Sequence, residues 1–464
     1  MITNMGIIGA FMVPHPPLII PEIGMGEEQR IQKTIDAYQK VARKIGEQQP
    51  ETIVLISPHQ TLYADYFHIS PAKNAKGDFG RFGVEKTVME VTYDTVFVTE
   101  LEKLAEKRKL PAGTLGEREK KLDHGTMVPL YFVNQYWQNY LLVRVGLSGL
   151  PFIKHYELGQ YIKEIAETLN RRTVIIASGD LSHRLKEDGP YGYCKEGPIY
   201  DRQIMEIMET GNFEKLLEFS EDFCEKAGEC GHRSFIIMAG ALDETKVVAN
   251  SLSYEGPFGV GYGICTYETQ GKDDERDFKR QYEKLQRQHI AEKRKLEDDY
   301  VRLARMTVEE YTRTGRKPQL PSGLPEELYQ QRAGVFVSIK ENSRLRGCIG
   351  TIQAIQASIA EEIIENAISA CSRDPRFDPI EPEELERLTI SIDVLGDTEK
   401  ITSVEMLDVK RYGVIVTKGR KRGLLLPNLE GVDTIDKQIA IAKQKAGIRL
   451  DEDVELERFE VVRH

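Results

Sequence analysis

The sequence predicts an α/β N-terminal domain, in which a central mixed sheet is flanked by helices, and an α+β C-terminal domain. In residues 1–268, short apolar runs rich in β-branched residues alternate with segments of helical apolar spacing, a pattern typical of a sheet covered by helices. Residues 300–464 mix strands and helices without a repeating unit, which favours α+β. Residues 269–299 are expected to form a charged helical linker between the domains.

Composition indicates a globular protein of the cytoplasm. The chain has 464 residues, 40% hydrophobic and 30% charged, with a formal net charge of -11. The acidic balance argues against nucleic acid and membrane surfaces as partners, because such binders carry a basic excess. No apolar run has the length of a membrane span, and no signal peptide is recognised. The six cysteines contain no CxxC pair, so we expect reduced thiols without disulfides.

The individual elements follow from periodicity and from glycine and proline positions. Residues 72–83 are polar and contain glycines, so they are expected to form an irregular loop over the edge of the site. The apolar stripe of the linker also permits a short coiled-coil contact between two copies. Strands are expected at 6–12, 51–57, 140–146, 172–178, 246–252, 259–267, 334–339, 388–395, 411–418, 423–426 and 454–462, and helices at 27–48, 158–171, 200–210, 212–219, 235–242, 300–312, 355–370 and 434–445.

Three of the predicted central strands end close to a histidine. The strand at 6–12 is followed by His15 within the sequence VPHPP, whose prolines stiffen the chain. The strand at 51–57 is followed by His59, and the strand at 172–178 by His183. In open α/β sheets, ligands bind at the carboxyl ends of the strands. These three histidines therefore predict a metal site or an acid–base site at that edge.

A carboxylate and a thiol compete for the third ligand position. Neutral imidazole is the commonest metal ligand, and two histidines with one carboxylate form the usual site for non-heme Fe(II). His15 and His59 are the most rigidly presented histidines, and Glu229 supplies a carboxylate from a glycine-lined turn. The adjacent Cys230 is a softer ligand, which would favour copper or zinc. The sequence leaves the choice between Glu229 and Cys230 open.

Two further histidines are candidates for acid–base work. His183 and His124 are free to move protons or to orient oxygen if the other histidines bind metal. Asp180 lies three residues before His183 and is suited to hold its imidazole in one tautomer. Simpler roles are open for two of these residues: His124 as a turn residue and Asp180 as a helix N-cap. His232 is expected to cap or pack the start of a helix.

The motifs of the N-terminal domain resemble those of the LigB-type class III extradiol ring-cleavage dioxygenases and their Memo-like relatives. The resemblance covers residues 1–268. It rests on PHPP around His15, SPH ending at His59, DHG around His124, SGDLSH ending at His183, and ECG from Glu229. It implies a mononuclear Fe(II), with Cu or Zn as alternatives, and a catechol substrate cleaved with O2. It implies His15, His59 and Glu229 as metal ligands and His183 and His124 as catalytic residues.

The C-terminal domain resembles the AMMECR-one family over residues 300–464. The resemblance rests on LRGCIGT at 345–351, SRDPRF at 372–377 and GLLLP at 423–427. The LRGCIG segment is expected to form a tight turn around Cys348, with a thiol, an arginine and close-approach backbone suited to a small binding site; a buried structural thiol is the alternative. Arg373, Asp374 and Arg376 are expected to form an ion-pair cluster or an anion-binding patch.

Two functions of different class follow from these resemblances. The first is an Fe(II)-dependent extradiol dioxygenase that acts on a small aromatic substrate and O2, with the AMMECR-one domain as an accessory. The second is a non-catalytic Memo-like regulatory protein that binds a metal or a ligand. The pairing of domains resembles the AmmeMemoRadiSam system, which implies a radical-SAM protein as a possible partner. A homo-oligomer is also expected.

Overall fold

The computed structural model describes residues 6–342, 344–429 and 431–464 of the chain. The chain divides into two compact units, Met1–Glu283 and Lys284–His464. The predicted charged linker contains the helix α9 (Phe278–Lys295), which runs across the boundary between these units. Each unit is described by itself below.

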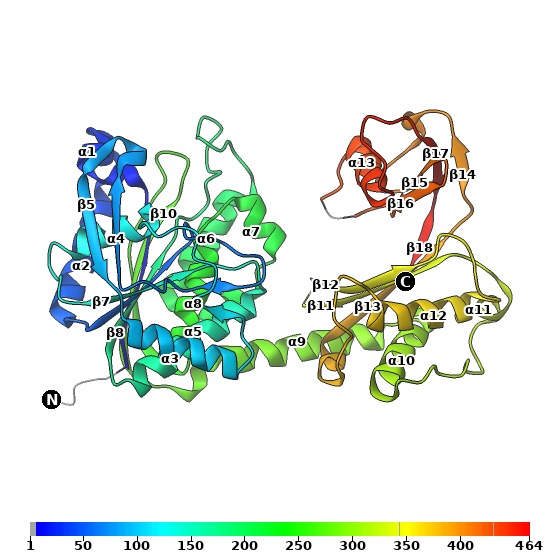
Figure 1. Ribbon diagram of the computed structural model, residues 1–464, viewed down its shortest axis with the longest axis horizontal. Coiled ribbons are helices and arrows are strands. Elements are labelled where there is room, and N and C mark those ends of the chain that lie inside the picture. The colour runs from blue at the N-terminus through cyan, green and yellow to red at the C-terminus, as the bar shows by residue number, and fades with distance from the viewer. Residues whose placement is uncertain (1–5, 343, 430) are drawn as a thin grey trace. The chain divides into compact units, whose positions relative to one another are not determined.

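The N-terminal unit is built around a six-stranded mixed sheet with the order β7-β2-β8-β1-β10-β9 (Figure 1). The four strands β7, β2, β8 and β1 are parallel, and β10 and β9 continue the sheet antiparallel. Parallel strands covered on both faces need continuous apolar runs, and β2 is buried at every position. The strands are β1 (Gly6–Val13), β2 (Thr52–Ser57), β7 (Leu141–Gly146), β8 (Arg172–Ser178), β9 (Thr245–Glu255) and β10 (Tyr262–Lys272).

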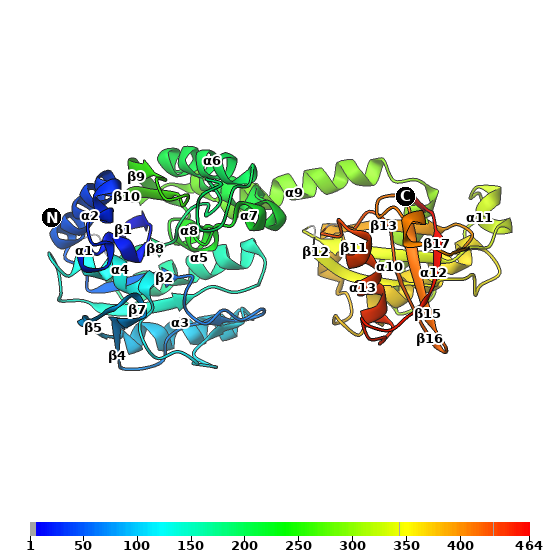
Figure 2. The same ribbon diagram turned by 90° about the horizontal axis from the view of Figure 1, so that it is seen from above.

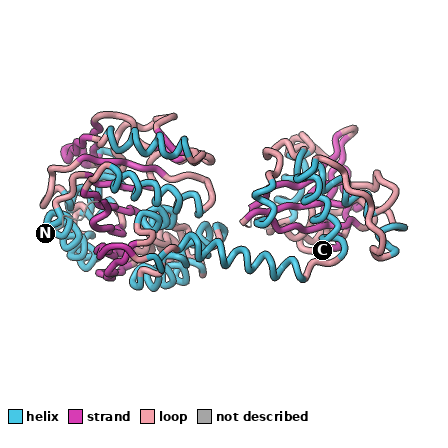
Figure 3. The backbone as a smooth tube through the Cα atoms, turned by 90° about the horizontal axis from the view of Figure 1, so that it is seen from below, coloured by secondary structure: helices cyan, strands magenta, loops and turns pink. Residues whose placement is uncertain are grey.

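Helices cover both faces of this sheet and form two separate cores. One core packs α3, α5, α6 and α8 against one face, and the other packs α2 and α4 against the opposite face. Figure 2 shows α2 on one side of the sheet and α5 and α8 on the other, and Figure 3 shows the strands in magenta between the cyan helices. The helices are α1 (Pro21–Gly24), α2 (Gln32–Gln48), α3 (Thr95–Lys107), α4 (His124–Val133), α5 (Phe152–Thr168), α6 (Glu196–Thr210), α7 (Glu221–Ala227) and α8 (His232–Ala241).

A β-hairpin occupies the segment that was expected to be an irregular loop. The strands β4 (Asn74–Phe79) and β5 (Val84–Thr92) pair antiparallel around a short 3-10 turn, η3 (Gly80–Phe82). Residues of β4 have low β-propensity, so the sequence predicted a loop at 72–83. That prediction was wrong because pairing with β5 stabilises this segment as a strand, in which buried and exposed residues largely alternate. The short strands β3 (Phe67–His68) and β6 (Ala112–Gly113) form a separate parallel pair.

The C-terminal unit contains two four-stranded antiparallel sheets. The first has the order β12-β11-β13-β18 and the second β14-β17-β15-β16. The helices α10 and α12 pack against the first sheet, and α13 packs against β15 and β16 (Figure 1). The elements are α10 (Asp299–Thr314), α11 (Glu326–Gln330), β11 (Val335–Glu341), β12 (Arg344–Gly350), α12 (Ile359–Ser372), β13 (Leu388–Leu395), β14 (Glu399–Ile401), β15 (Gly413–Lys418), β16 (Lys421–Leu425), α13 (Ile435–Lys445), β17 (Glu455–Phe459) and β18 (Val461–Arg463).

The predicted fold class of both domains is confirmed, but two local predictions for the C-terminal domain were wrong. The LRGCIG segment is the strand β12 and not a turn, because its backbone pairs with β11. The single strand expected at 454–462 is two strands, β17 and β18, which belong to different sheets. Within the described residues, no helix is long and apolar enough to span a membrane.

Candidate metal centre

Three neighbouring parallel strands bring their histidines to one edge of the sheet. The strands β2, β8 and β1 are adjacent in the order β2-β8-β1 and run in the same direction. Their carboxyl ends therefore meet at one edge, where His59, His183 and His15 follow them. A fourth histidine, His124, is the first residue of α4. This topology brings the ends of the three strands to one edge of the sheet.

The ligand atoms of His15, His59 and His124 all lie within 4.8 Å of one another. The Nε2 atoms of His15 and His59 are 2.9 Å apart. The His59 and His124 ring centroids are separated by 3.9 Å. His15 is fully enclosed, with 1% of its surface exposed. Three imidazole nitrogens this close together have the chemistry of a transition-metal site, because imidazole suits iron, copper and zinc.

Ser178 determines which nitrogen of His15 is available to a metal. Its hydroxyl donates to the carbonyl oxygen of Gly125 at 2.6 Å. The same oxygen lies 2.9 Å from Nδ1 of His15. Since the hydroxyl hydrogen is already used, Ser178 accepts a hydrogen bond from Nδ1–H of His15. Nε2 of His15 then carries the lone pair, on the side that faces His59.

A buried ion pair holds the N-terminus of α4 and with it His124. Asp123 caps this helix, accepting from the backbone N–H of Thr126 at 2.9 Å. Its carboxylate also accepts from Ser57 Oγ at 2.5 Å and lies 3.5 Å from Nε of Arg144, a fully buried side chain of β7. The cap thus connects α4 to β2 and β7, and this fixes the first residue of α4 against the sheet edge.

Asp180 lies between two of the histidines. Its Oδ1 accepts from the backbone N–H of His15 at 2.8 Å. Its Oδ2 is 4.0 Å from Nε2 of His15 and 4.0 Å from Nε2 of His183. Nε2 of His183 is buried and has no hydrogen-bond partner among the described residues. An unpartnered buried ring nitrogen beside a histidine cluster is suited to exchange a proton with a bound substrate.

The two candidate third ligands, Glu229 and Cys230, lie in different surroundings. Sγ of Cys230 is 3.6 Å from Nε2 of His15, and it forms a second potential ligand group with His15 and Asp180. The Glu229 carboxylate instead accepts from the backbone N–H of His232 at 2.6 Å, at the start of α8. Glu229 belongs to neither potential ligand group found among the described residues. Its role as a metal ligand stays a prediction.

A close approach of two glycines explains why Cys230 reaches the histidines. A Cβ atom on Gly179, directly after β8, would lie 2.1 Å from Cα of Gly231. Only glycine permits this contact. It places the 229–231 turn against the end of β8, and the backbone N–H of Asp180 donates to Sγ of Cys230 at 3.2 Å.

Burial keeps the histidines of this centre neutral. Burial lowers the pKa of His15 well below its ordinary value, and the neighbouring His59, His124 and His183 lower it further. Burial also lowers the pKa of His59 and lowers those of His124 and His183 to about 4. Neutral imidazole is the form that binds metals. Burial has the opposite effect on the carboxyls and raises the pKa of Asp180 and of Glu229 to about 7.

Two aromatic side chains beside the centre were not identified from the sequence. Phe82, at the end of η3, has its ring centroid 5.4 Å from that of His124. Tyr191 has its ring 5.1 Å from that of His183. Both are partly exposed, by 37% and 61%. Isolated aromatic residues in polar segments give no periodic signal, so only the folded chain shows that they flank the histidines.

The remaining histidines of the N-terminal domain have structural surroundings. His232 is buried in α8, where its Nε2 lies 3.0 Å from the carbonyl oxygen of Leu216 and its Nδ1 lies 3.2 Å from the Tyr200 hydroxyl. His68 and His155 are also buried. These contacts agree with the expectation that His232 packs the start of the helix.

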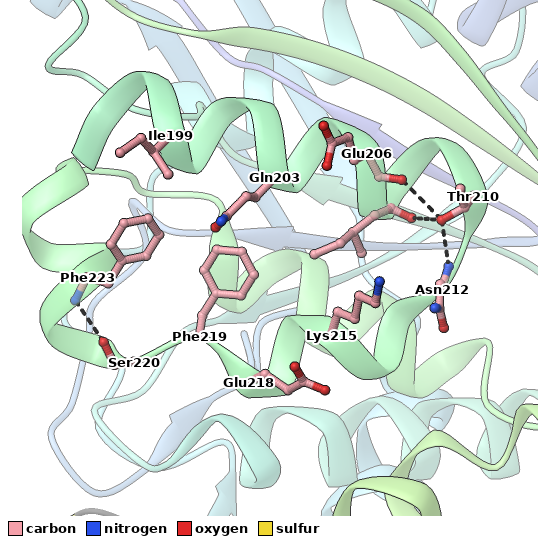
Figure 4. Close-up of a pocket in the computed structure, with 11 residues that line it drawn as sticks. Ile199, Gln203, Glu206, Thr210, Asn212, Lys215, Glu218, Phe219, Ser220 and Phe223 are labelled. Carbon is pink, nitrogen blue, oxygen red and sulfur yellow. Dashed lines mark hydrogen bonds between the residues drawn. The ribbon is translucent and has the colours of Figure 1, made fainter. Parts of the chain in front are cut away.

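A cavity of about 870 Å³ lies elsewhere in the N-terminal domain (Figure 4). It is formed by α6, α7 and the 3-10 helix η4 (Phe213–Glu218). Phe219 and Phe223 form its apolar wall, and Glu206 and Lys215 lie at its polar side. None of the predicted site residues lines it.

The two family matches lie on either side of the boundary between the two structural units. Residues 9–265 match the family described as the catalytic LigB subunit of aromatic ring-opening dioxygenase. Residues 301–464 match the AMMECR1 family. A protein of Clostridium acetobutylicum is 40% identical over 468 residues, which cover 99% of this chain and 99% of that protein. A protein of Thermotoga maritima is 47% identical over 170 residues, which cover 36% of this chain and 98% of that protein.

Two solved structures are similar to parts of the chain. An uncharacterized protein from Pyrococcus horikoshii is 35% identical, with a TM-score of 0.34, and the match covers 35% of this chain and 88% of that one. An uncharacterized protein from Escherichia coli K12 is 15% identical, with a TM-score of 0.38, and the match covers 57% of this chain and 99% of that one.

Proposed function

Because the chain belongs to the family of the catalytic LigB subunit of aromatic ring-opening dioxygenase, followed by an AMMECR1 domain, we propose that its N-terminal domain is a metal-dependent extradiol dioxygenase. Its substrates are a catechol-type aromatic compound and O2. The observation that carries the proposal is the set of three neutral imidazoles, His15, His59 and His124, whose ligand atoms lie within 4.8 Å of one another.

The donor set fits a first-row transition metal. The Nε2 atoms of His15 and His59 face one another at 2.9 Å, and Ser178 keeps the proton of His15 on the opposite ring nitrogen. Fe(II) is the proposed metal, with copper or zinc as alternatives. An Fe(II) ion held by these histidines would supply the one-electron chemistry that allows O2 to react with an aromatic ring.

The surrounding side chains suit a dihydroxylated ring. The buried Nε2 of His183 has no partner within the described residues, so it can accept a proton from a catechol hydroxyl and return it later. Burial lowers the pKa of His183 to about 4, so its imidazole is neutral at pH 7. Phe82 and Tyr191 lie beside His124 and His183, where their rings can stack on an aromatic substrate.

The test measures O2 consumption by Fe(II)-loaded full-length protein with a panel of catechols, together with the absorbance of ring-opened products. His183→Ala is expected to lower kcat by about 10²–10⁴-fold, the usual contribution of a general base. His289→Ala, a histidine exposed on α9, is the matched control and should leave the rate unchanged. The proposal fails if iron-loaded wild-type protein consumes no O2 with any catechol.

A second candidate is a non-catalytic, Memo-like regulatory protein. It is favoured by the thiol of Cys230, which lies 3.6 Å from Nε2 of His15, while the Glu229 carboxylate accepts a hydrogen bond at the start of α8. A thiolate ligand favours copper or zinc over iron. In this candidate function the centre binds a ligand or a partner, for which a radical-SAM protein and a second copy of the chain remain proposals. Co-purification with a radical-SAM protein, lost in His15→Ala, would support it.

A further inference from the structure

The loop after β8 that carries His183 is held by backbone hydrogen bonds. The N–H of Leu181 donates to the carbonyl oxygen of Gly261 at 2.9 Å, and the N–H of Gly261 donates back to the carbonyl oxygen of Ser182 at 2.8 Å. The N–H of His183 itself donates to the carbonyl oxygen of Gly228 at 3.2 Å. The loop is therefore tied to the residue before β10 and to the residue after α7.

A carboxylate from α6 holds the residue directly before His183. Oδ1 of Asp201 accepts from the backbone N–H of Ser182 at 2.7 Å, and Oδ2 accepts from the Tyr254 hydroxyl at 2.7 Å. Asp201 lies in α6, and Tyr254 lies near the end of β9. Asp201 and Ser182 are both buried, so their hydrogen bond is stronger than it would be in water. Asp201 thus connects a helix and a strand to the loop of His183.

Two glycines allow α6 to lie this close to the loop. A Cβ atom on Gly261 would lie 2.1 Å from Oδ2 of Asp201. A Cβ atom on Gly197, in the first turn of α6, would lie 2.6 Å from Oγ of Ser182. A larger residue at either position would displace the carboxylate or the hydroxyl. The contact between Asp201 and Ser182 therefore depends on the close packing of three segments.

The burial of Asp201 is unfavourable for its charged form. Burial raises the pKa of the Asp201 carboxyl to about 7, and the hydrogen bonds from Ser182 and Tyr254 act against this rise. Burial and the neighbouring Asp201 also raise the pKa of Tyr254. An apolar side chain in place of Asp201 would avoid these costs, but it would leave the N–H of Ser182 without this acceptor. The hydrogen bond to the loop is therefore a reason for a carboxyl at this position.

The position of the His183 ring depends on this backbone. Its Nε2 atom is buried and has no hydrogen-bond partner among the described residues, so no side chain fixes the imidazole through that atom. Oδ2 of Asp180 is 4.0 Å from the same nitrogen. A general base must come within about 3 Å of the atom whose proton it accepts, so a displacement of the loop would move Nε2 out of reach.

We propose that Asp201 is a positioning residue, which holds the backbone of Ser182 so that the His183 imidazole faces the substrate. The inference rests on the proposed function, in which His183 accepts the proton of a catechol hydroxyl. What matters is the hydrogen-bond acceptor and not the negative charge, since an amide oxygen can accept from the same N–H. Asp201→Asn should therefore retain the role, with its NH2 group donating to the Tyr254 oxygen. Asp201→Ala should lose it.

Steady-state kinetics of Fe(II)-loaded full-length protein with a catechol give the first test. Asp201→Ala should lower kcat by about 10–100-fold, because displacing a catalytic group by about 1 Å costs up to about 100-fold, and KM should change little. Asp201→Asn should keep the wild-type kcat. Tyr254→Phe leaves the bond to Ser182 but frees Oδ2, so its kcat should lie between the two. Tyr254 is 44% exposed, so this variant tests the same contact with little effect on the core.

Asp243→Ala is the matched control. Asp243 is also buried, and its carboxylate accepts from the Tyr156 hydroxyl and from Nε2 of Gln160, both at 2.6 Å. Asp243 precedes β9, whereas Tyr254 lies at the other end of that strand. Loss of the Asp243 carboxylate should therefore lower the stability of the domain and leave kcat unchanged.

The NMR signals of the His183 ring test its position without turnover. They are recorded on full-length protein that is isotope-labelled at histidine, with diamagnetic Zn(II) in place of Fe(II), and they are assigned by their loss in His183→Ala. The signals should shift in Asp201→Ala and stay unchanged in Asp201→Asn and Asp243→Ala. If the wild-type protein consumes no O2 with any catechol, the proposed function fails, but the NMR signals still test the role of Asp201.

Three results would overturn the inference. The first is an unchanged His183 signal in folded Asp201→Ala, and the second is an equal shift in Asp243→Ala. The third is an Asp201→Asn protein that behaves like Asp201→Ala. If Asp201→Ala does not fold, an unchanged His183 signal and an unchanged kcat in Tyr254→Phe would overturn it as well.

Discussion

Ser178 Oγ accepts a hydrogen bond from Nδ1 of His15 at 2.9 Å, and it donates its own hydrogen to the carbonyl oxygen of Gly125. The serine at the end of β8 therefore orients the buried histidine that follows β1. This pair links two parallel strands at the sheet edge where the other histidines gather. In a histidine that binds a metal through one ring nitrogen, the hydrogen bond at the other ring nitrogen fixes the tautomer. Removing the Ser178 hydroxyl therefore tests whether His15 binds a metal.

Ser178→Ala should weaken metal binding by about 10–100-fold, the usual effect of removing a group that orients a ligating histidine. Without the acceptor, Nδ1 of His15 no longer has a fixed proton, and Nε2 is less available. Metal affinity is measured by competition with a chelator. The matched control is Ser234→Ala, since the hydroxyl of Ser234 is buried and has no hydrogen-bond partner among the described residues. Equal affinities in the two variants would argue against the orienting role.

Replacing Cys230 and Glu229 separately should distinguish the two candidate functions. If the thiol is a ligand, Cys230→Ser loses metal and Glu229→Gln retains it, because the Glu229 carboxylate is engaged with the backbone N–H of His232. If the carboxylate is a ligand, the opposite result is expected, and iron is the metal. Metal content is determined by mass spectrometry on protein purified without oxygen. We expect both variants to retain iron, because the proposed ligands are His15, His59 and His124, whose ligand atoms lie within 4.8 Å of one another; loss of metal in Cys230→Ser alone would support the second candidate function.

The stability of the N-terminal domain should depend on pH through His232. Burial lowers its pKa to about 3, against about 6.5 in an unfolded chain. Below pH 6.5 the unfolded state takes up a proton that the folded state does not bind, so stability falls as pH decreases from 6.5 toward 3. This cost amounts to about 2 kcal/mol at pH 5.

His232→Asn removes that cost. Any loss in the free energy of unfolding caused by this substitution should therefore be about 2 kcal/mol smaller at pH 5 than at pH 8. The only tryptophan of the chain, Trp137, lies in the N-terminal unit, so urea unfolding followed by tryptophan fluorescence reports on this domain alone. If the free energies of unfolding of the variant and of wild type differ by the same amount at pH 5 and at pH 8, the prediction that His232 is buried in its neutral form is contradicted.

Asp123→Asn should destabilise the N-terminal domain by about 3–5 kcal/mol, because it leaves Arg144 as an unpaired buried charge. The Arg144 side chain is fully buried and lies 3.5 Å from the Asp123 carboxylate. Glu164→Gln is the control, because its partner Arg108 and Glu164 itself are each 43% exposed, and exposed ion pairs contribute little. Fluorescence of Trp137 during urea unfolding measures both effects. A much smaller loss in the free energy of unfolding of Asp123→Asn would contradict this prediction and show that Arg144 pairs with another group.

The apolar periodicity of the chain was sufficient to predict the central strands and the main helices. Residues 172–178 form β8 as expected, and the strands before His15 and His59 lie within one residue of their predicted positions. These segments are buried, so their composition is determined by the core alone. The prediction of a loop at residues 72–83 was wrong because the formation of a hairpin with one exposed face depends more on the partner strand than on the residues of the strand itself.

The apolar pattern of the sequence was enough to predict the fold class of each domain and the strands that precede His15, His59 and His183, because strands buried on both faces of a sheet need continuous apolar runs. The remaining geometry of the site depends on how the folded chain packs. Packing placed Cys230 beside His15 through the contact of Gly179 with Gly231, and it engaged the Glu229 carboxylate at the start of α8. Contacts between distant segments depend on how the elements pack, and a local pattern carries no information about them.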